Sequence, residues 1–584
     1  MKPLSFVLLG AFLSGAVVHA QVEQLATSGD GGVLLFHSRF RLQTETDLGP
    51  QGKIYRWQDG VWTRLVAAPD IGFAVSPPDV FSPFLSSDGK VVGWQINVGC
   101  VLCQIIVVPP LSSEVSGVSL PATFPRGTVR MSPNGRYFTA DDYPFRGAQY
   151  LDAATGATAD VPVDLFARPV ARELANDGTA LLLITQPKDA AQFNAPGTLS
   201  LWKPGSDPQP LYSENRVFGP AISANGGRIA FEAVVEGGPN DDQRTLMVLD
   251  TQTGERVAVG SMPPKDYRAT FESFAKPVWD ASGTKLIYRT FDDQARPVAI
   301  SLWDAGTRES RVVLTSSEGF TSAVIGGDGR IIWAVTSTNR LLRLDLFTGL
   351  TDEILPPLGS ITRGPDGDGV PGSAILIRGT GFTKTQIALD GDVQLPVVDA
   401  GPEGLWIQIP WEYASLDRGI HKLLIRSQNN PFEEFANIVL TPGISLHFAT
   451  WSDPASGIAY AKAVHQDFGS LITPLSPARR GETVHVYLTG LGPLDQTLPT
   501  GAPGPLSPLA HPLATLNCSL GNNLSQSLQI PYVGYAPALI GIYQADITIP
   551  DDAPEGSPPL FCTASDSQGH KSTDEAILST SSAR

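Results

Sequence analysis

The stretch SPNGRYFTA (Ser132–Ala140) joins a tight turn ending in glycine to a basic residue and a short, mainly apolar run. The same pattern occurs seven times, as SGDGGVLLF (Ser28–Phe36), SSDGKVVGW (Ser86–Trp94), SPNGRYFTA (Ser132–Ala140), ANDGTALLL (Ala175–Leu183), SANGGRIAF (Ser223–Phe231), DASGTKLIY (Asp280–Tyr288) and GGDGRIIWA (Gly326–Ala334). Its glycines follow one another at spacings of 43 to 58 residues, which suit one four-stranded sheet per repeat. The repeats therefore predict an all-β chain that begins with a seven-bladed β-propeller.

A second tight turn follows in every repeat except the second. These turns are WQDG (Trp57–Gly60), DAATG (Asp152–Gly156), WKPG (Trp202–Gly205), DTQTG (Asp250–Gly254), WDAG (Trp303–Gly306) and DLFTG (Asp345–Gly349). Glycine accepts the positive φ that such hairpin turns need. Two hairpins per repeat predict four strands per blade.

These repeats resemble the TolB-type, WD-repeat-like propeller repeats of exported bacterial proteins, in which S-P-D-G-K/R lies between two apolar strands. SPNGR (Ser132–Arg136) is the closest copy, and the resemblance covers about residues 22–358. We assign 21–358 to the propeller. The resemblance implies a fold and leaves the function open, because such propellers serve as docking platforms, peptidase lids and lyase scaffolds.

Composition narrows the function classes. The 584 residues carry a net charge of −17, which disfavours nucleic acid and anionic membrane surfaces as partners. The chain has 58 Gly and 49 Pro but only 17% charged residues, a balance typical of short strands joined by turns.

The N-terminus is typical of a secretory signal. Lys2 precedes an apolar run, and small residues precede a predicted cleavage after Ala20, so we assign 1–20 to a signal peptide. A retained membrane helix is the alternative, which the short apolar run disfavours. We expect a secreted or periplasmic protein that is not inserted in a membrane after cleavage.

Four cysteines suit an oxidising compartment. Cys100 and Cys103 form a CxxC between two strand-like runs, for which a local disulfide or free thiols are both possible, the disulfide being favoured. Cys518 and Cys562 lie in separate strand-like runs of the last domain, and a disulfide between those strands is the simplest pairing.

The repeat pattern stops after Pro357. Residues 359–372 are rich in Gly, Pro and Asp and predict a linker, with a calcium loop around Asp366 and Asp368 as the disfavoured alternative. Residues 373–441 resemble an IPT/TIG immunoglobulin-like domain, through PGSAILIRGTGF (Pro371–Phe382) and LWIQIP (Leu405–Pro410). The resemblance implies a β-sandwich.

Residues 442–584 resemble the C-terminal domain of exported acidobacterial proteins of the Solibacter type. The matching stretches are RRGETVHVYLTGLGP (Arg479–Pro493), GAPGPLSPLAHPLA (Gly501–Ala514) and VGYAPALIGIYQADITIPDDAPEGSPPL (Val533–Leu560). The resemblance implies export and a second immunoglobulin-like β-sandwich, and no activity. The cysteine pair and the polar tail depart from that family's pattern.

Strand parity places the glycine turns on one face of the propeller. The connections between the second and third strands then lie on the opposite face, which we predict to bind the partner. The candidate residues on these connections are Asp141, Asp142, Asp241, Asp242, Arg244, Asp292 and Asp293. Solvated loops without a ligand are the alternative interpretation.

Motifs of known enzymes are absent from the sequence, including G-x-S-x-G, HExxH, Walker A and the Rossmann fingerprint. The last domain holds five isolated histidines, His447, His465, His485, His511 and His570, for which scattered imidazoles are favoured over a metal site. We therefore predict a non-catalytic binding protein for a protein or glycan, without cofactor or metal. The alternative is a polysaccharide lyase or glycosidase that uses acids on the propeller loops.

Overall fold

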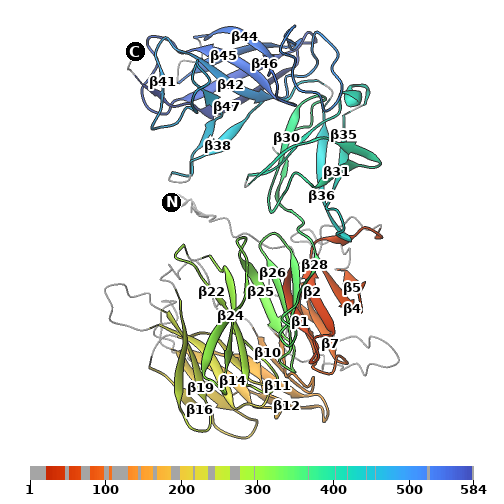
Figure 1. Cartoon of the computed structure of the whole chain (residues 1–584), viewed down its shortest axis with the longest axis vertical. Helices are drawn as coiled ribbons and strands as arrows, with labels where there is room; N and C mark the ends of the chain where they lie inside the picture. The colour runs from red at the N-terminus through yellow and green to blue at the C-terminus, as the bar shows by residue number, and fades with distance from the viewer. Residues whose placement is uncertain are drawn as a thin grey trace, which may run out of the picture. The chain divides into compact units, whose positions relative to one another are not determined.

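The structure is a computed structural model that describes residues 22–45, 52–67, 79–97, 104–107, 129–142, 147–161, 168–185, 197–214, 217–234, 244–262, 277–294, 296–365, 367–401, 403–416, 418–441, 443–453, 456–521 and 526–581. The chain divides into two compact units. Unit 1 comprises Met1–Arg39, Gln51–Ser337 and Leu341–Ile354; unit 2 comprises Phe40–Pro50, Thr338–Arg340 and Leu355–Arg584. The predicted all-β class is confirmed, since one 3-10 turn, Trp411–Ser415, is the only helix in the described part of the chain (Figure 1).

Unit 1 holds six four-stranded sheets and one three-stranded sheet among its described residues. The first four sheets are β1, β2, β4 and β5 (Val22–Thr27, Val33–Ser38, Lys53–Gln58, Val61–Ala67); β6 to β8 (Asp79–Leu85, Val92–Asn97, Gln104–Val107); β9 to β12 (Val129–Met131, Tyr137–Asp142, Gly147–Asp152, Ala157–Asp160); and β13 to β16 (Arg168–Leu174, Ala180–Thr185, Gly197–Trp202, Gln209–Tyr212). The last three are β17 to β20 (Val217–Ile222, Arg228–Val234, Arg244–Asp250, Arg256–Met262); β21 to β24 (Val278–Trp279, Lys285–Thr290, Ala299–Asp304, Glu309–Thr315); and β25 to β28 (Phe320–Ile325, Ile331–Thr336, Leu341–Asp345, Thr351–Leu355). Within each sheet the strands pair in chain order, which is the meander of a propeller repeat.

Strand direction confirms the parity argument. In the sheet β9 to β12 all pairs are antiparallel, so the turn between the first and second strands lies at the same end of the sheet as the turn between the third and fourth. In the third sheet, for example, these turns end in Gly135 (φ 73°) and Gly156 (φ 73°), as the repeat pattern predicts. The first strands of successive sheets contact one another, since β1 touches β6 and β25 and β13 touches β9 and β17.

Each first turn is stabilised by its own side chains. In the second sheet, Ser86 Oγ donates to Asp88 Oδ1 (2.6 Å) and accepts from the N–H of Val91 (2.9 Å). The Asp88 carboxylate also accepts from the N–H of Lys90 (3.1 Å), and Gly89 takes the positive φ of 72° that closes the turn. The Ser-x-Asp/Asn-Gly pattern therefore exists because it satisfies the backbone of the turn.

Neighbouring first turns are also bonded to each other, in a ring. Backbone N–H groups of Gly29, Ser87, Asn176 and Ala281 donate to the carbonyls of Ser87, Pro133, Ala224 and Gly327 (2.6, 2.6, 2.7 and 2.9 Å). Pro133 has no N–H, and there the N–H of Asn134 donates to Asn176 Oδ1 (2.7 Å). Asn225 Nδ2 donates to the carbonyl of Ser282 (2.7 Å). The N–H of Asp328 closes the ring by donating to the carbonyl of Gly29 (2.7 Å), so the first and last repeats are neighbours.

Unit 2 contains two pairs of packed sheets. The first pair is β29, β30, β34 and β33 (Ser360–Pro365, Ala374–Thr380, Gly404–Gln408, Val397–Gly401) facing β3, β36, β35, β31 and β32 (Arg41–Leu42, Phe432–Leu440, Gly419–Arg426, Ile387–Asp390, Val393–Leu395). Ile377, Leu405, Leu423 and Ile438, all unexposed, belong to the core between these sheets. The predicted linker 359–372 is corrected here, because Ser360–Pro365 pairs with β30 as a strand of the first sheet.

The second pair fills the C-terminal part. One sheet is β37, β42, β45 and β44 (His447–Phe448, Thr483–Thr489, Tyr543–Thr548, Gln529–Tyr535), with β40 (Ala463–Val464) paired to β42; the other is β38, β39, β47, β46 and β43 (Thr450–Ser452, Ala459–Ala461, Lys571–Ile577, Pro559–Ser565, Thr515–Leu520). A short parallel pair joins β41 (Ala478–Arg479) to β48 (Thr580–Ser581). Val486, Leu488, Ile547 and Leu560 are unexposed members of one core.

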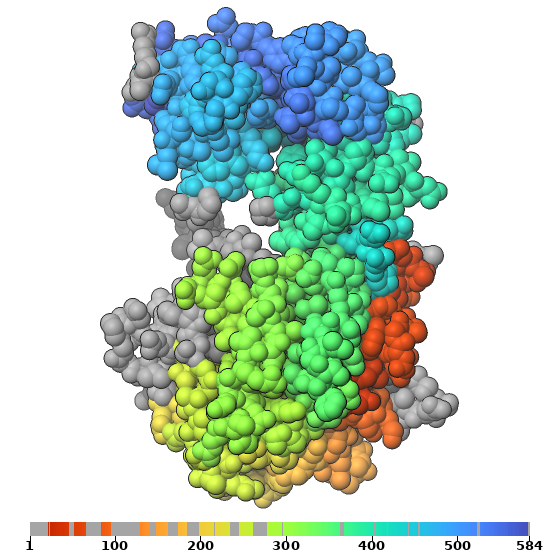
Figure 2. Space-filling view, in the orientation of Figure 1, coloured from red at the N-terminus to blue at the C-terminus, as the bar shows by residue number. Residues whose placement is uncertain are grey.

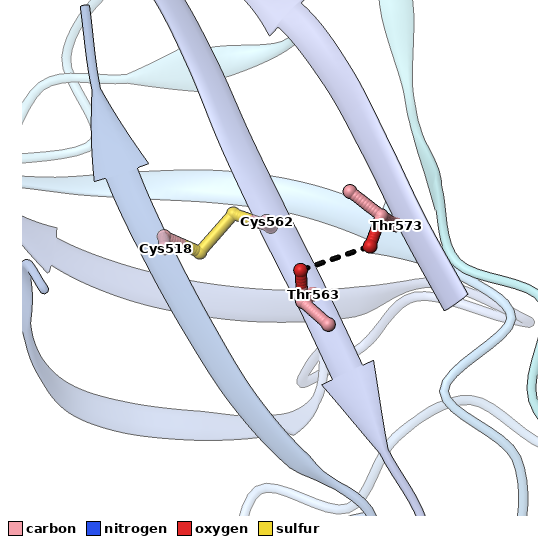
Figure 3. The surroundings of a disulfide bond; sticks show 4 residues. All are labelled: Cys518, Cys562, Thr563 and Thr573. Carbon is pink, nitrogen blue, oxygen red and sulfur yellow. Dashed lines mark hydrogen bonds between the residues drawn. A yellow bond between two sulfur atoms is a disulfide. The ribbon is translucent and has the colours of Figure 1, made fainter. Parts of the chain in front are cut away.

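A disulfide joins two neighbouring strands of the second of these sheets. Cys518 on β43 and Cys562 on β46 are directly opposite residues whose Cα atoms lie 4.1 Å apart, and their sulfurs are bonded (Figure 3). Next to it, Thr563 and Thr573 share a hydrogen bond of 2.9 Å between their hydroxyls. The predicted Cys518–Cys562 pairing is confirmed, whereas Cys100, Cys103 and residues 1–20 lie outside the described residues.

The two sheet pairs are joined through buried polar side chains. Gln408, which is unexposed, donates to the hydroxyl of Tyr535 (3.0 Å) and accepts from the N–H of Gly501 (2.6 Å). The N–H of Ala374 donates to the carbonyl of Gly541 (2.7 Å). The predicted boundary at Thr441 therefore separates two sheet pairs that belong to one compact unit.

One strand of unit 2 comes from far away in the sequence. Arg41–Leu42 pairs with Glu433 and Phe432 at the edge of the second sheet. The side chain of Glu433 is unexposed and contacts two guanidiniums, those of Arg41 and Arg426, the latter at 2.5 Å. The connection between β2 and β4, which we predicted to be a surface loop of the propeller, thus supplies a buried cation and an edge strand to unit 2.

Candidate functional site

The predicted binding residues do not form one cluster in the described structure. Asp141 and Asp142 end β10 and pair with Ala148 and Gly147 on β11, so they lie on a strand and not in the connection. The expectation was wrong there because the hairpin pairing extends further than the apolar pattern indicated. Asp241 and Asp242 lie outside the described residues.

Arg244, which the sequence analysis placed on a surface connection, lies elsewhere in the structure. It begins β19, its side chain is 1% exposed, and its guanidinium contacts the unexposed carboxylate of Glu232 on β18 at 3.3 Å. The guanidinium also lies over the ring of Phe218, 4.5 Å from the ring centre. The residue is therefore part of the interior of the fifth sheet, and its charge is used within the fold.

Asp292 and Asp293 do lie between two strands, β22 and β23. The Asp292 carboxylate accepts from the N–H groups of Gln294 (3.0 Å) and Arg296 (2.9 Å) and from the Arg296 guanidinium (2.8 Å). The backbone N–H of Arg296, and then its guanidinium, hold the pKa of Asp292 below its usual value. This carboxylate therefore shapes its own turn, while Asp293 is exposed beside it.

Titratable groups elsewhere are dispersed. Among the described residues no group of three or more His, Cys, Asp or Glu side chains is arranged to hold a metal ion. Five histidines each contact one carboxylate: His421 with Asp390 (2.7 Å), His447 with Asp574 (3.8 Å), His465 with Glu482 (2.7 Å), His485 with Asp546 (2.7 Å) and His570 with Asp566 (2.8 Å). His511 contacts the carbonyl of Val533 (2.8 Å).

One carboxyl has a strongly shifted pKa. Glu173 lies on β13, the first strand of its sheet, where burial raises the pKa of its carboxyl to about 7 against the opposing effect of the Arg130 guanidinium. Such shifts are common at functional sites. Acid–base catalysis of glycoside cleavage would need a second carboxyl at a defined distance from Glu173.

On the face of the glycine turns, the described residues of unit 1 include the linings of two hollows. The first, of about 480 Å³, is bounded by first turns of the ring, including Gly29, Asp30, Asp88 and Asp328. The second, of about 510 Å³, lies between the sheets β21–β24 and β25–β28, whose surface faces the viewer in Figure 2 in yellow-green and green. We name the second one the Phe347 hollow; its lining includes Lys285, Asp304, Glu309, Arg311, Arg330 and Phe347.

The turn that carries Phe347 can be compared with three others of the same kind. The turns at Asp152, Asp250, Asp304 and Asp345 each begin with a carboxylate that accepts from the N–H two residues later, at 2.8 to 3.0 Å. At that second position they carry Ala154, Gln252, Gly306 and Phe347, and at the fifth Ala157, Glu255, Glu309 and Leu350. The hydrogen bonding of the turn therefore requires neither Phe347 nor Leu350.

Phe347 and Leu350 are nevertheless placed in solvent, with 85% and 67% of their surfaces exposed. Arg330 lies 5.7 Å from the centre of the Phe347 ring, and its guanidinium binds the Asp345 carboxylate with contacts of 2.6 to 3.1 Å. Those contacts lower the pKa of Asp345 to about 2. A fixed cation thus lies beside an exposed aromatic ring.

The opposite wall of the hollow carries charges of both signs. On β22, β23 and β24, one row of cross-strand neighbours consists of Lys285, Asp304 and Glu309. Two residues further along β24, Arg311 pairs with Leu302 on β23. Lys285 Nζ donates to the carbonyl of Gly329 (2.7 Å), which leaves its ammonium two further donors. Exposed aromatic and charged groups around one concave surface are typical of a binding site.

Sequence reasoning found the turn DLFTG but not its role. The signal was present, because the apolar pair in this turn departs from the Ala, Gln, Gly and Glu residues at the same positions of the other turns. The hollow itself depends on two repeats being neighbours in space, and that follows only from the packed sheets.

The chain is similar to solved β-propeller structures at low identity. No family model matches the chain, and no curated protein matches it. Among solved structures, the β-propeller domain of the Trilobed protease from Pyrococcus furiosus matches over 58% of this chain and 96% of its own, with 12% identity and a TM-score of 0.42.

An oligogalacturonate lyase from Vibrio parahaemolyticus matches over 54% of this chain and 86% of its own, with 13% identity and a TM-score of 0.38. A putative TolB from Agrobacterium tumefaciens matches over 39% and 80%, with 13% identity and a TM-score of 0.28. At these identities and TM-scores, the assignment of propeller repeats depends on the sheets and turns described above.

Proposed function

We propose that this chain is an exported, non-catalytic binding protein whose propeller holds a protein or glycan partner. The proposal includes a propeller of seven blades, supported by the closed ring of first turns, followed by the IPT/TIG-like and Solibacter-type sandwiches. Export is supported by the Cys518–Cys562 disulfide. No helix in the described part of the chain is long and apolar enough to cross a membrane.

The observation that carries the proposal is the Phe347 hollow. The Phe347 side chain is 85% exposed, so it contributes little hydrophobic stabilisation to the fold. The equivalent turns of other sheets form without an aromatic residue at this position. Exposed aromatic residues at the centre of a concave, partly charged surface are the usual anchors of binding interfaces. Binding on the opposite face, through the connections of 186–196 and 235–243, stays a prediction, since those residues lie outside the described structure.

A binding assay on the full chain tests this proposal. We would screen immobilised protein against a glycan array and a peptide array, then repeat the positive signals with Phe347→Gln, which installs the residue of the matching turn at Gln252. Gln252→Ala is the matched control. We expect Phe347→Gln to weaken binding at least tenfold with unchanged melting temperature, and the control to leave binding unchanged.

Two results would contradict the proposal. Binding that is equal for wild type and Phe347→Gln would remove the hollow as the site. Release of unsaturated or hydrolysed products from a bound polysaccharide would favour the lyase or glycosidase alternative, with acids on the propeller.

A further inference from the structure

The Phe347 hollow adjoins an unpaired sheet edge. Strand β24 (Glu309–Thr315) is the last strand of its sheet, and no described residue pairs with its outer side. Its first four residues are all exposed, although Ser310 on one face of the strand donates to the carbonyl of Val259 on β20 (3.1 Å). Unpaired N–H and C=O groups along an exposed edge are a template for another extended chain.

Two charged side chains at this edge have no partner in the described part of the chain. Glu309 and Arg311 line the hollow two residues apart, so they project from the same face of β24. Neither side chain makes a hydrogen bond or ion pair with any described residue. Glu309 lies directly across from Asp304, a like charge, and Lys285 is the cross-strand neighbour of Asp304 on its other side.

The charge pattern restricts the ligand. A bound molecule that desolvates this wall must offer a cation to Glu309 and an anion to Arg311, because unpaired buried charges oppose binding. A neutral or acidic glycan supplies no cation, and it has no backbone amides for the open edge of β24. A peptide segment supplies both charges on alternate residues and both kinds of backbone group.

We infer that the ligand of the Phe347 hollow is an extended segment of a partner protein that adds as a strand to the edge of β24. This inference rests on the proposed function and names its ligand class. The segment carries a basic and an acidic residue two positions apart, opposite Glu309 and Arg311 respectively. An apolar side chain near them packs against Phe347, which Arg330 holds at the other wall of the hollow.

The test uses a random heptapeptide library displayed on phage, selected on the full chain, with a glycan array in parallel. The library is selected again on a double variant, Glu309→Arg with Arg311→Glu, which exchanges the two charges at an exposed site. We expect wild-type selections to enrich one order of the two charges at a spacing of two, with an apolar residue nearby. The double variant should enrich the reverse order, and Phe347→Gln should weaken the selected peptides at least tenfold.

The outcomes separate the inference from the proposed function. Binding of glycans alone, lost in Phe347→Gln, would overturn the peptide inference and leave the binding function standing. Selected peptides whose charge order does not reverse in the double variant would also overturn the inference. If no peptide or glycan signal depends on Phe347, both are wrong.

Discussion

Arg41 offers a direct test of the strand that unit 2 takes from the N-terminal part of the chain. Replacing Arg41 by Met keeps most of the apolar stem and removes the charge that faces the unexposed carboxylate of Glu433. Arg426 remains, 2.5 Å from the same carboxylate, so the buried anion keeps one of its two cations. Removing one partner of a buried pair costs roughly 3–5 kcal/mol, and we expect the lower end because Arg426 stays.

A loss of about 3 kcal/mol corresponds to a melting temperature lower by roughly 6–12 °C for a unit of this size. The matched control is Lys384→Met, which removes a similar contact of 2.9 Å to Asp399 where both side chains are 60% or more exposed. We expect that change to cost less than about 1 kcal/mol. Proteolysis across a temperature series, read by mass spectrometry, gives separate melting curves for peptides of unit 1 and unit 2.

The expected result is a lower melting temperature for peptides of β35 and β36 in Arg41→Met only. Equal curves for the two variants would show that the pairing of Arg41–Leu42 with β36 contributes little to unit 2. The same logic applies to cleavage of the chain within residues 364–372. The C-terminal fragment would lack β3 and Arg41, so it should be less stable than unit 2 in the intact chain.

Three further predictions concern other parts of the fold. Asn225→Ala removes three hydrogen bonds of 2.7 to 2.9 Å within and between first turns, so it should destabilise unit 1 by about 1–2 kcal/mol in urea unfolding without affecting the Phe347 hollow. Cys518 and Cys562 are 44 residues apart, and replacing both by Ala should destabilise unit 2 by up to about 4 kcal/mol. Only peptides of unit 2 should then have a lower melting temperature. Arginine contacts lower the pKa values of Asp152 and Asp345 to about 2, so their stabilisation is complete above about pH 4 and is lost as the pH falls toward 2. The double Asn variant at these positions should flatten the decline of the melting temperature of unit 1 between pH 4 and pH 2.

Local chemistry explains why the propeller repeats were predictable. Ser86, Asp88 and Gly89 satisfy a turn whose hydrogen bonds lie within six residues, so their pattern is visible in the sequence. The disulfide was predictable for a similar reason, since two cysteines in strand-like runs leave few pairings. Both signals are short-range or belong to a very small set of residues.

The charged residues were harder to place. Arg244 occurs in a polar stretch that looks like a loop, but a strand begins at Arg244 itself and its charge is balanced by Glu232, twelve residues earlier. Arg41 is balanced by Glu433, from the other end of the chain. Which charges are buried depends on such long-range pairs, and no local pattern records them.

Repetition within the chain helps to separate structural from functional residues. Pro133 differs from the residues at its position in the other first turns because it has no N–H to donate to the next turn. The N–H of Asn134 donates to Asn176 Oδ1 and replaces that bond. A change that is compensated in this way is explained by the fold. Phe347 also departs from its repeat position, but its turn keeps the same hydrogen bonds and its ring stays 85% exposed. Because the turn keeps its hydrogen bonds without requiring that ring, we expect the ring to contact a ligand, and the edge of β24 beside it to be where that ligand lies.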